Sequence, residues 1–165
     1  MNTYEAKPPL TLEEIWAIED ADGFVGALET YLYHKEWKRK LPLSICEQNV
    51  RDICGLDANI CIDGFCTLFY QVFSLADCHR VEAAMREMGL HQLADWFAEA
   101  RLIYCRRRTD LTEDAYDALE PFSLDGSEGR RFDEIGELFI GDDSELFKIA
   151  APIKAYVMQH RGEFT

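Results

Sequence analysis

Four histidines, at positions 34, 79, 91 and 160, are the first side chains to consider for acid–base or metal chemistry. His91 and Asp95 lie four residues apart and would share one face of a helix, where they could pair. A catalytic or metal site needs further groups at fixed spacing, and neither residue has a third partner nearby in the sequence. We therefore interpret the histidines as structural residues.

The six cysteines could supply thiolate chemistry or zinc ligands. They are Cys46, Cys54, Cys61, Cys66, Cys78 and Cys105. They contain no C-x-x-C pair, and no histidine is spaced to complete a zinc site. In a reducing compartment cysteines behave as small apolar residues, so we expect buried free thiols. A redox pair formed by Cys61 and Cys66 is an alternative that no other feature of the sequence supports.

Carboxylates are far more numerous than histidines or cysteines. The chain has 31 Asp and Glu against 17 Lys and Arg, which gives a formal net charge of −14. The stretches 125–128 and 141–145 do not match a calcium-binding loop. The sequence contains no nucleophile elbow, phosphate-binding loop, zinc-protease motif or dinucleotide fingerprint. We expect no enzymatic activity, no cofactor and no metal. A carboxylate-based metal hydrolase is a weaker alternative, which requires several acids to converge in one cleft.

The acidic side chains are concentrated in two segments. Residues 1–34 carry seven acids against Lys7, a net of −6, and residues 109–147 carry thirteen acids against Arg130 and Arg131, a net of −11; all other residues sum to +3. Such a surface repels nucleic acid and anionic membranes and attracts basic proteins. The candidate partner-binding residues are Glu13, Glu14, Asp20, Glu113, Asp114, Asp117, Glu120, Asp133, Glu134, Glu137, Asp142, Asp143 and Glu145.

Helical periodicity predicts how the second segment presents its carboxylates. A helix is expected over about 112–120 and a short one over 132–140, after a loop over 121–129. The apolar side chains of each, such as Tyr116 and Ile135, recur on one face and should be buried. The carboxylates of both helices fall on the opposite faces and should point to water.

Capping boxes at 11–14 and 44–47, and a further cap signal at 74–77, predict where three other helices begin. We expect the first helix to end near Gly23 and the second to begin at Phe24. The second helix runs into basic residues at 35–40, which suit a helix C-terminus. The helix from Ser44 should end at Gly55.

The segment 60–73 is apolar nearly all round, which predicts a central buried helix. Two further helices should follow, one from the cap at 74–77 to Gly89 and one from about Leu90 to Ala100. The last helix should run from about 144 to 160 and kink or split at Pro152.

These elements predict an all-α fold, in which residues 1–165 form one domain, a bundle of about seven to nine helices with short connections. No apolar run approaches the roughly 20 residues that a bilayer span needs, and no signal sequence is visible. We therefore expect a cytoplasmic protein without membrane contact. The sequence does not decide between a monomer and a homodimer, and leaves the role of the basic residues at 38–40 and 106–108 open.

The segment 62–71, IDGFCTLFYQ, resembles the turn and aromatic helix of the bacterial DNA-mimic protein family. Ile62 and Asp63 replace an Asn-Gly pair of the family pattern, and Gln71 stands where the family usually has Asn. Later motifs of the family are similar to 81–89, 93–100, 116–119 and 156–160, so that the likeness covers about two thirds of the chain. The motif residues themselves look structural.

The resemblance implies a protein whose negative surface imitates duplex DNA. Such a protein would occupy the DNA-binding surface of a helix-turn-helix transcription factor and relieve repression, without binding nucleic acid itself. Lys, Arg and helix N-termini of such factors hold phosphates, and a carboxylate can accept the same hydrogen bonds. An immunity or antitoxin protein that inhibits a basic nuclease would use the same electrostatics and is the main alternative.

Overall fold

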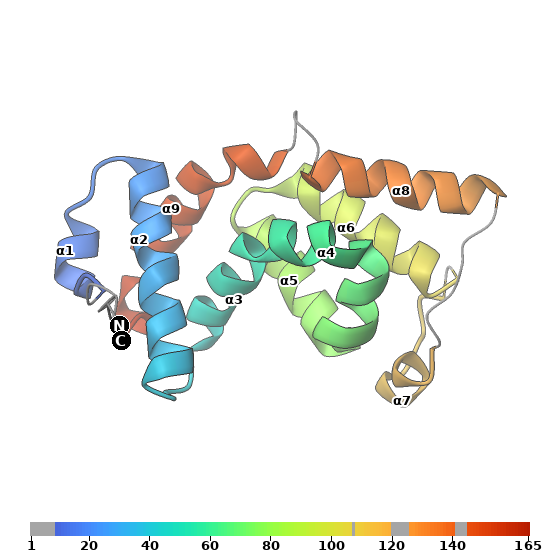
Figure 1. Cartoon of the computed structure of the whole chain (residues 1–165), viewed down its shortest axis with the longest axis horizontal. Helices are drawn as coiled ribbons and strands as arrows, with labels where there is room; N and C mark the ends of the chain where they lie inside the picture. The colour runs from blue at the N-terminus through green and yellow to red at the C-terminus, as the bar shows by residue number, and fades with distance from the viewer. Residues whose placement is uncertain (1–8, 107, 120–125, 141–144) are drawn as a thin grey trace, which may run out of the picture.

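The computed structural model describes residues 9–106, 108–119, 126–140 and 145–165 (Figure 1). These residues form nine α-helices and no β-strand, which confirms the predicted all-α fold. The helices are α1 (Leu12–Trp16), α2 (Ala21–Tyr33), α3 (Ile45–Cys54), α4 (Leu56–Thr67), α5 (Leu75–Glu87), α6 (His91–Tyr104), α7 (Glu113–Asp117), α8 (Gly126–Ile140) and α9 (Ala150–Gln159). Two π-helical turns, η1 (His34–Lys38) and η2 (Leu68–Val72), continue α2 and α4.

Two groups of helices share one hydrophobic core. In the first group α1, α2 and α9 pack together, so the last helix of the chain returns to the second (Figure 1). In the second group α4 and α6 both pack against α8, and α5 packs against α6. Helix α3 contacts both groups, and one cluster of buried apolar side chains extends from Ile15 to Phe164.

The predicted helix starts are confirmed at Thr11, Ser44 and Ser74, where each side chain and the acid three residues later form a capping box. The predicted boundary at Gly23 is wrong. The Asp20 carboxylate accepts a hydrogen bond from the Gly23 amide at 2.7 Å, so Asp20 is the N-cap of a helix that begins at Ala21. A strong capping side chain therefore decides the boundary, and the glycine lies inside the first turn.

The central apolar segment forms α4 and η2, but it is not buried all round. Ile60 and Leu68 are buried, whereas Tyr70 and Val72 are 45% and 44% exposed. Gly64 has a φ of +72°, a left-handed conformation that interrupts the regular geometry of α4. The turn that the family resemblance implies therefore lies inside this helix.

Boundaries in the last third differ from the prediction. Helix α7 has only five residues, 113–117, whereas α8 begins at 126, within the predicted loop, and has fifteen. Glu128 in the first turn of α8 favours a helix N-terminus. The predicted last helix is split, but before Pro152 and not at it: a 3₁₀ turn at Glu145–Lys148 precedes α9, and the proline lies in the first turn of α9, where it is tolerated.

Phe65 holds the second group of helices together. Its ring lies 5.4 Å from that of Phe69, 6.3 Å from Phe97 on α6, and 5.9 and 5.1 Å from Phe132 and Phe139 on α8. Most of these contacts are edge-to-face, the arrangement that aromatic quadrupoles favour. This cluster fixes the side of α8 that faces the core, and therefore the side that faces solvent.

Candidate partner-binding surface

The outer side of α8 carries three exposed carboxylates, Asp133, Glu134 and Glu137, which we call the α8 face. Phe132 and Ile135 on the other side of the same helix are buried. The predicted orientation of this helix is therefore confirmed. Asp133 and Glu137 have no ion-pair partner among the described residues, and they stand about 6 Å apart along the helix axis.

Glu134 is less free, because Arg131 links it to α6. The Arg131 guanidinium donates two hydrogen bonds of 2.8 Å to the Glu99 carboxylate and lies 3.5 Å from Glu134. The hydrogen bonds from Arg131 lower the pKa of Glu99, although partial burial acts in the opposite direction. This pair links α8 to α6, and the longer contact between Arg131 and Glu134 offsets part of one negative charge at the edge of the α8 face.

Helix α7 presents a second, smaller group of carboxylates. Asp114 and Asp117 are exposed, as predicted, and Tyr116 on the opposite side is buried. Glu113 has a different role, because its carboxylate accepts hydrogen bonds from the backbone amides of Leu75 and Ala76 at the start of α5. Glu113 is therefore a helix cap supplied from another element, and is not available in the same way to a partner.

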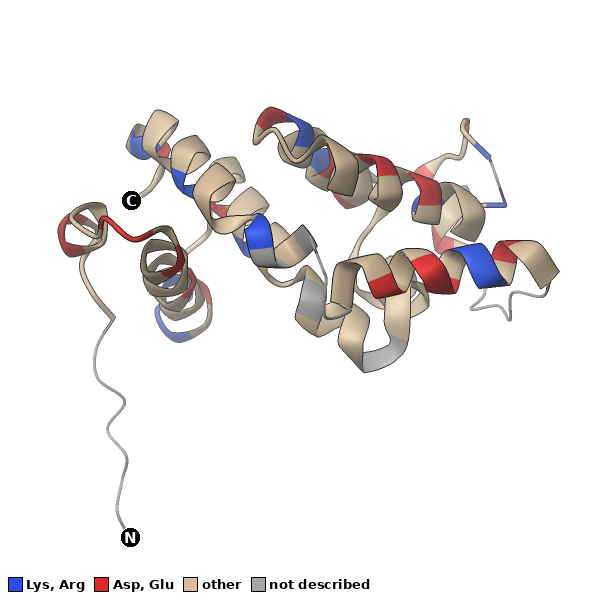
Figure 2. Cartoon of the chain, turned by 90° about the horizontal axis from the view of Figure 1, so that it is seen from above, with Lys and Arg blue, Asp and Glu red and all other residues tan. Residues whose placement is uncertain are grey.

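The acids of α7 and α8 belong to separate surfaces. In Figure 1 α8 runs along the upper edge of the molecule and α7 lies at its lower right. Figure 2 shows acidic positions on several separate helices, with basic positions between some of them. The sequence segment with a charge of −11 is therefore divided in space, and α8 carries its most compact described group of exposed acids.

In the N-terminal segment, Glu13 is exposed on α1, whereas two other candidates are helix caps. Glu14 completes the capping box of α1, and Asp20 caps α2. Of the remaining candidates, Glu120, Asp142 and Asp143 lie outside the described residues. Glu145 begins the 3₁₀ turn Glu145–Lys148, and its side chain is not described.

Sequence reasoning missed two groups of charged residues. Glu99 and Asp95 lie on α6, in a part of the chain whose summed charge is close to neutral, yet α6 packs beside α8. Lys35 was grouped with the basic residues at the end of α2, but it is buried and forms an ion pair of 2.7 Å with Glu47. Summing charge along the sequence could not reveal either pairing.

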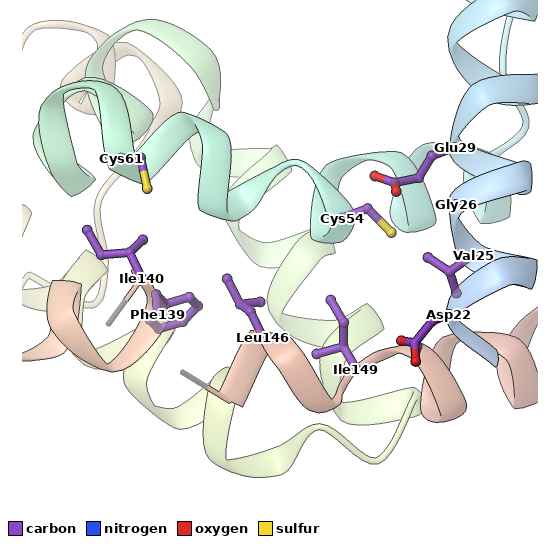
Figure 3. A pocket seen from close by; sticks show the side chains of 11 residues that line it. Asp22, Val25, Gly26, Glu29, Cys54, Cys61, Phe139, Ile140, Leu146 and Ile149 are labelled. Atoms are coloured by element: carbon purple, nitrogen blue, oxygen red, sulfur yellow. The ribbon is translucent and has the colours of Figure 1, made fainter. Parts of the chain in front are cut away.

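A cavity between α2 and the end of α8 has a volume of about 440 Å³ (Figure 3). Its lining includes Phe139, Leu146 and Ile149, with the carboxylates of Asp22 and Glu29 at the α2 end. The described residues include no group of three His, Cys, Asp or Glu side chains arranged to hold a metal ion. Asp22 and Glu29 are the acids among the described residues that line this cavity.

All six cysteines are free thiols, as predicted, but only Cys78 and Cys105 are fully buried, and Cys61 is exposed. Burial raises the pKa of Cys78 to about 12, despite a contact with the Tyr116 hydroxyl that acts in the opposite direction. Burial also raises the pKa of Cys66, and the charge of Asp133 on α8 adds to that effect. These thiols are therefore poor nucleophiles at neutral pH.

Within the ranges that the structure describes, no helix has the length and apolar character needed to cross a membrane. The chain matches no curated protein and no solved structure. A family model described as DMP19-like protein matches residues 41–160, which is well over half of the chain and includes α3 to α9. The chain therefore belongs to the DMP19-like protein family.

Proposed function

We propose that this protein is a DNA mimic, which places exposed carboxylates on the DNA-binding surface of a basic protein and so prevents that protein from binding DNA. A helix-turn-helix transcription factor is the partner class that the family resemblance implies. The net charge of −14 and membership of the DMP19-like family support the proposal.

The α8 face is the observation that carries the proposal. Asp133, Glu134 and Glu137 are exposed within about 6 Å of helix axis, and among them only Glu134 contacts a described cation, Arg131, whose closer partner is Glu99. The three carboxylates span that length at a mean axial spacing of about 3 Å, close to the roughly 3.4 Å per phosphate along one strand of duplex DNA. The α8 face therefore resembles a short stretch of one phosphate backbone.

Charge alone limits the affinity that this surface can provide. An exposed ion pair contributes about 0.2–1 kcal/mol, so a handful of them supplies only a few kcal/mol, before the entropy cost of association is subtracted. Displacement of a protein from a specific DNA site also requires complementary shape or high abundance. The partner should therefore be complementary in shape to the surface that α8 and α6 form together. The Glu99–Arg131 ion pair helps to hold these two helices in place.

The proposal is tested by capturing partners from an extract of the source organism on the immobilised full chain, and then eluting with duplex DNA. We expect duplex DNA to release a protein that itself binds DNA, because both ligands occupy one surface. The variant D133K/E134K/E137K should not capture this protein. A matched control, E13K/D114K/D117K, makes the same change in charge on other surfaces and should capture it normally.

Two results would contradict the proposal. One is that duplex DNA releases no DNA-binding protein, and the other is that the control variant loses the partner as completely as the α8 variant. Recovery of a basic nuclease whose activity the chain inhibits would support the alternative of an immunity or antitoxin protein, which would use the same surface.

A further inference from the structure

The two π-helical turns, η1 and η2, meet at one groove with a volume of about 450 Å³. Trp37 from η1 and Val72 from η2 both line this groove, which we call the Trp37 groove, together with Phe73 and the polar side chains of Gln48 and Asn59. π-helical turns within α-helices are rare and occur often at functional sites. The presence of two such turns at one groove makes this region a candidate functional site.

Exposed apolar side chains are concentrated near the same two turns in the sequence, and Trp37 and Val72 among them line the groove. Of the eight large apolar residues that are exposed in the described part of the chain, six lie in η1 or η2 or within seven residues of them: Tyr33, Trp37, Leu41, Ile45, Tyr70 and Val72. Trp37 is 56% exposed. Exposed aromatic side chains of this kind are typical anchors of protein interfaces, because they bury a large area at low cost in conformational entropy.

Three consecutive cations, Lys38, Arg39 and Lys40, follow Trp37 directly in the sequence. All three are exposed and have no ion-pair partner among the described residues. By contrast, Arg80, Arg86 and Arg131 each bind two carboxylates. In a chain with almost twice as many acids as bases, unpaired cations at one place form a local surface of opposite sign.

Lys40 is the cation of this group that contacts a lining residue of the groove. Its ammonium group lies 5.3 Å from the centre of the Trp37 ring, in a cation–π contact. Lys40 has a φ of +56°, a left-handed conformation at the end of η1 where glycine would be unstrained. The chain thus keeps a charged side chain beside Trp37 at a position that favours glycine.

The two acids that line the groove are already paired with cations. Asp77 and Asp52, which both line it, bind the guanidinium of Arg80, and Asp52 also binds Arg51 at 2.6 Å. Hydrogen bonds from Ser74 and Arg80 lower the pKa of Asp77, although burial opposes them. A negatively charged occupant would therefore meet Lys40 beside Trp37 and no unpaired carboxylate among the described lining residues.

We propose that the Trp37 groove binds an acidic polypeptide segment of another protein, with an apolar side chain against Trp37 and Val72 and carboxylates against Lys38, Arg39 and Lys40. The net charge of −14 disfavours long nucleic acid at this position, whereas a short segment with an apolar anchor uses both features of the groove. In Figure 1 η1 lies at the lower end of α2, far from α8, so this site is independent of the α8 face.

The test begins with selection of a random peptide library, displayed on phage, against the full chain, with W37A as the counter-selection. The best-enriched peptide is then titrated into ¹⁵N-labelled protein while the three indole NH signals are followed by NMR. We expect acidic peptides with an aliphatic or aromatic residue, and a shift of the Trp37 signal only, with Trp16 and Trp96 as internal references.

Replacing the acids of that peptide by glutamine should weaken binding at least tenfold. W37A should weaken it about 30-fold, which corresponds to the roughly 2 kcal/mol of an interface hot spot. K38A/R39A should weaken it and reduce its dependence on salt. M158A and R130A, which remove an exposed apolar and an exposed basic side chain elsewhere, should leave it unchanged.

Several results would overturn the proposal. They are enrichment of basic or uncharged peptides, equal binding of the glutamine peptide, and unaltered binding by a W37A protein whose circular dichroism is that of the wild type. A DNA duplex that shifts the Trp37 signal as readily as the peptide would assign the groove to nucleic acid. A Trp37 shift that follows protein concentration without peptide would assign it to a second copy of the chain.

Discussion

The Glu113 carboxylate accepts hydrogen bonds of 3.0 and 3.2 Å from the backbone amides of Leu75 and Ala76, and so satisfies the first turn of α5 from outside that helix. Within α5, Ser74 caps only the amide of Asp77. Glu113 belongs to the most acidic segment of the sequence, yet its charge is used inside the fold. A carboxylate in an acidic segment is therefore not by itself a candidate for partner binding.

Loss of this cap should lower stability without affecting partner binding. We expect E113A to reduce the free energy of unfolding by about 0.5–2 kcal/mol, because two helix amides lose a charged acceptor. The adjacent D114A should change it by no more than about 0.5 kcal/mol, since Asp114 is exposed. Urea unfolding of both variants measures the difference, and equal values would show that the Glu113 contact contributes nothing.

Removal of one partner of the buried Lys35–Glu47 ion pair should lower the free energy of unfolding far more than E113A does. The Lys35 ammonium donates to both carboxylate oxygens of Glu47, at 2.8 and 2.7 Å, and to the carbonyl of Thr165 at 2.7 Å. We expect E47A to destabilise the protein by about 3–5 kcal/mol, because a buried cation loses its counter-ion.

Replacement of both partners, as in K35M/E47L, should recover most of that loss, because apolar residues of similar volume need no compensation. Chemical unfolding of the single and double variants completes the comparison. A double variant as unstable as E47A would show that packing or capping by Glu47, and not its pairing with Lys35, is decisive.

The Glu99–Arg131 pair should make stability depend on pH in the acidic range. The Arg131 hydrogen bonds hold the pKa of Glu99 below its ordinary value of 4.5, so the ionised pair stabilises the fold above that value. The contribution is lost as the pH falls through the lower folded-state pKa. E99Q should therefore be less stable than wild type at pH 7, by up to about 1 kcal/mol because the pair is exposed.

The difference between E99Q and wild type should shrink towards zero as the pH is lowered below 4.5, and should also decrease at high salt. Urea midpoints over a series of pH values measure it. A difference that persists unchanged in acid would mean that the pair acts through packing.

Gly64 and Gly26 should respond to alanine in opposite directions. Gly64 has a φ of +72° and Gly26 lies inside α2, and an added Cβ would meet nothing within 4 Å at either position. G64A should cost about 1–2 kcal/mol through backbone strain, whereas G26A should gain about 0.5–1 kcal/mol through helix propensity. Thermal unfolding of both variants checks the sign of each effect.

Local sequence signals predicted much of the fold. Thr11, Ser44 and Ser74 begin helices as their capping patterns indicate, and Phe132 and Ile135 face the core as helical spacing requires. These predictions succeeded because the physical causes, a hydrogen bond across one turn and burial of one helix face, act between residues close in sequence.

Partnerships between distant residues could not be predicted in this way. Arg131 meets Glu99 and Glu113 meets Leu75 only because the packing of aromatic rings around Phe65 and Tyr116 brings their helices together. The same packing separates α7 from α8 and decides which of the acids are exposed together. The candidate surface therefore became smaller and better defined once the helices were placed.

The most direct test of the DNA-mimic function is a gel-shift competition, with the captured DNA-binding protein on its labelled DNA. The wild-type chain and E13K/D114K/D117K should displace the labelled DNA from this protein at similar concentrations. D133K/E134K/E137K should displace no DNA even at a concentration at least ten times higher. Unaltered competition by D133K/E134K/E137K, with helical content preserved, would contradict the account and remove the α8 face from it.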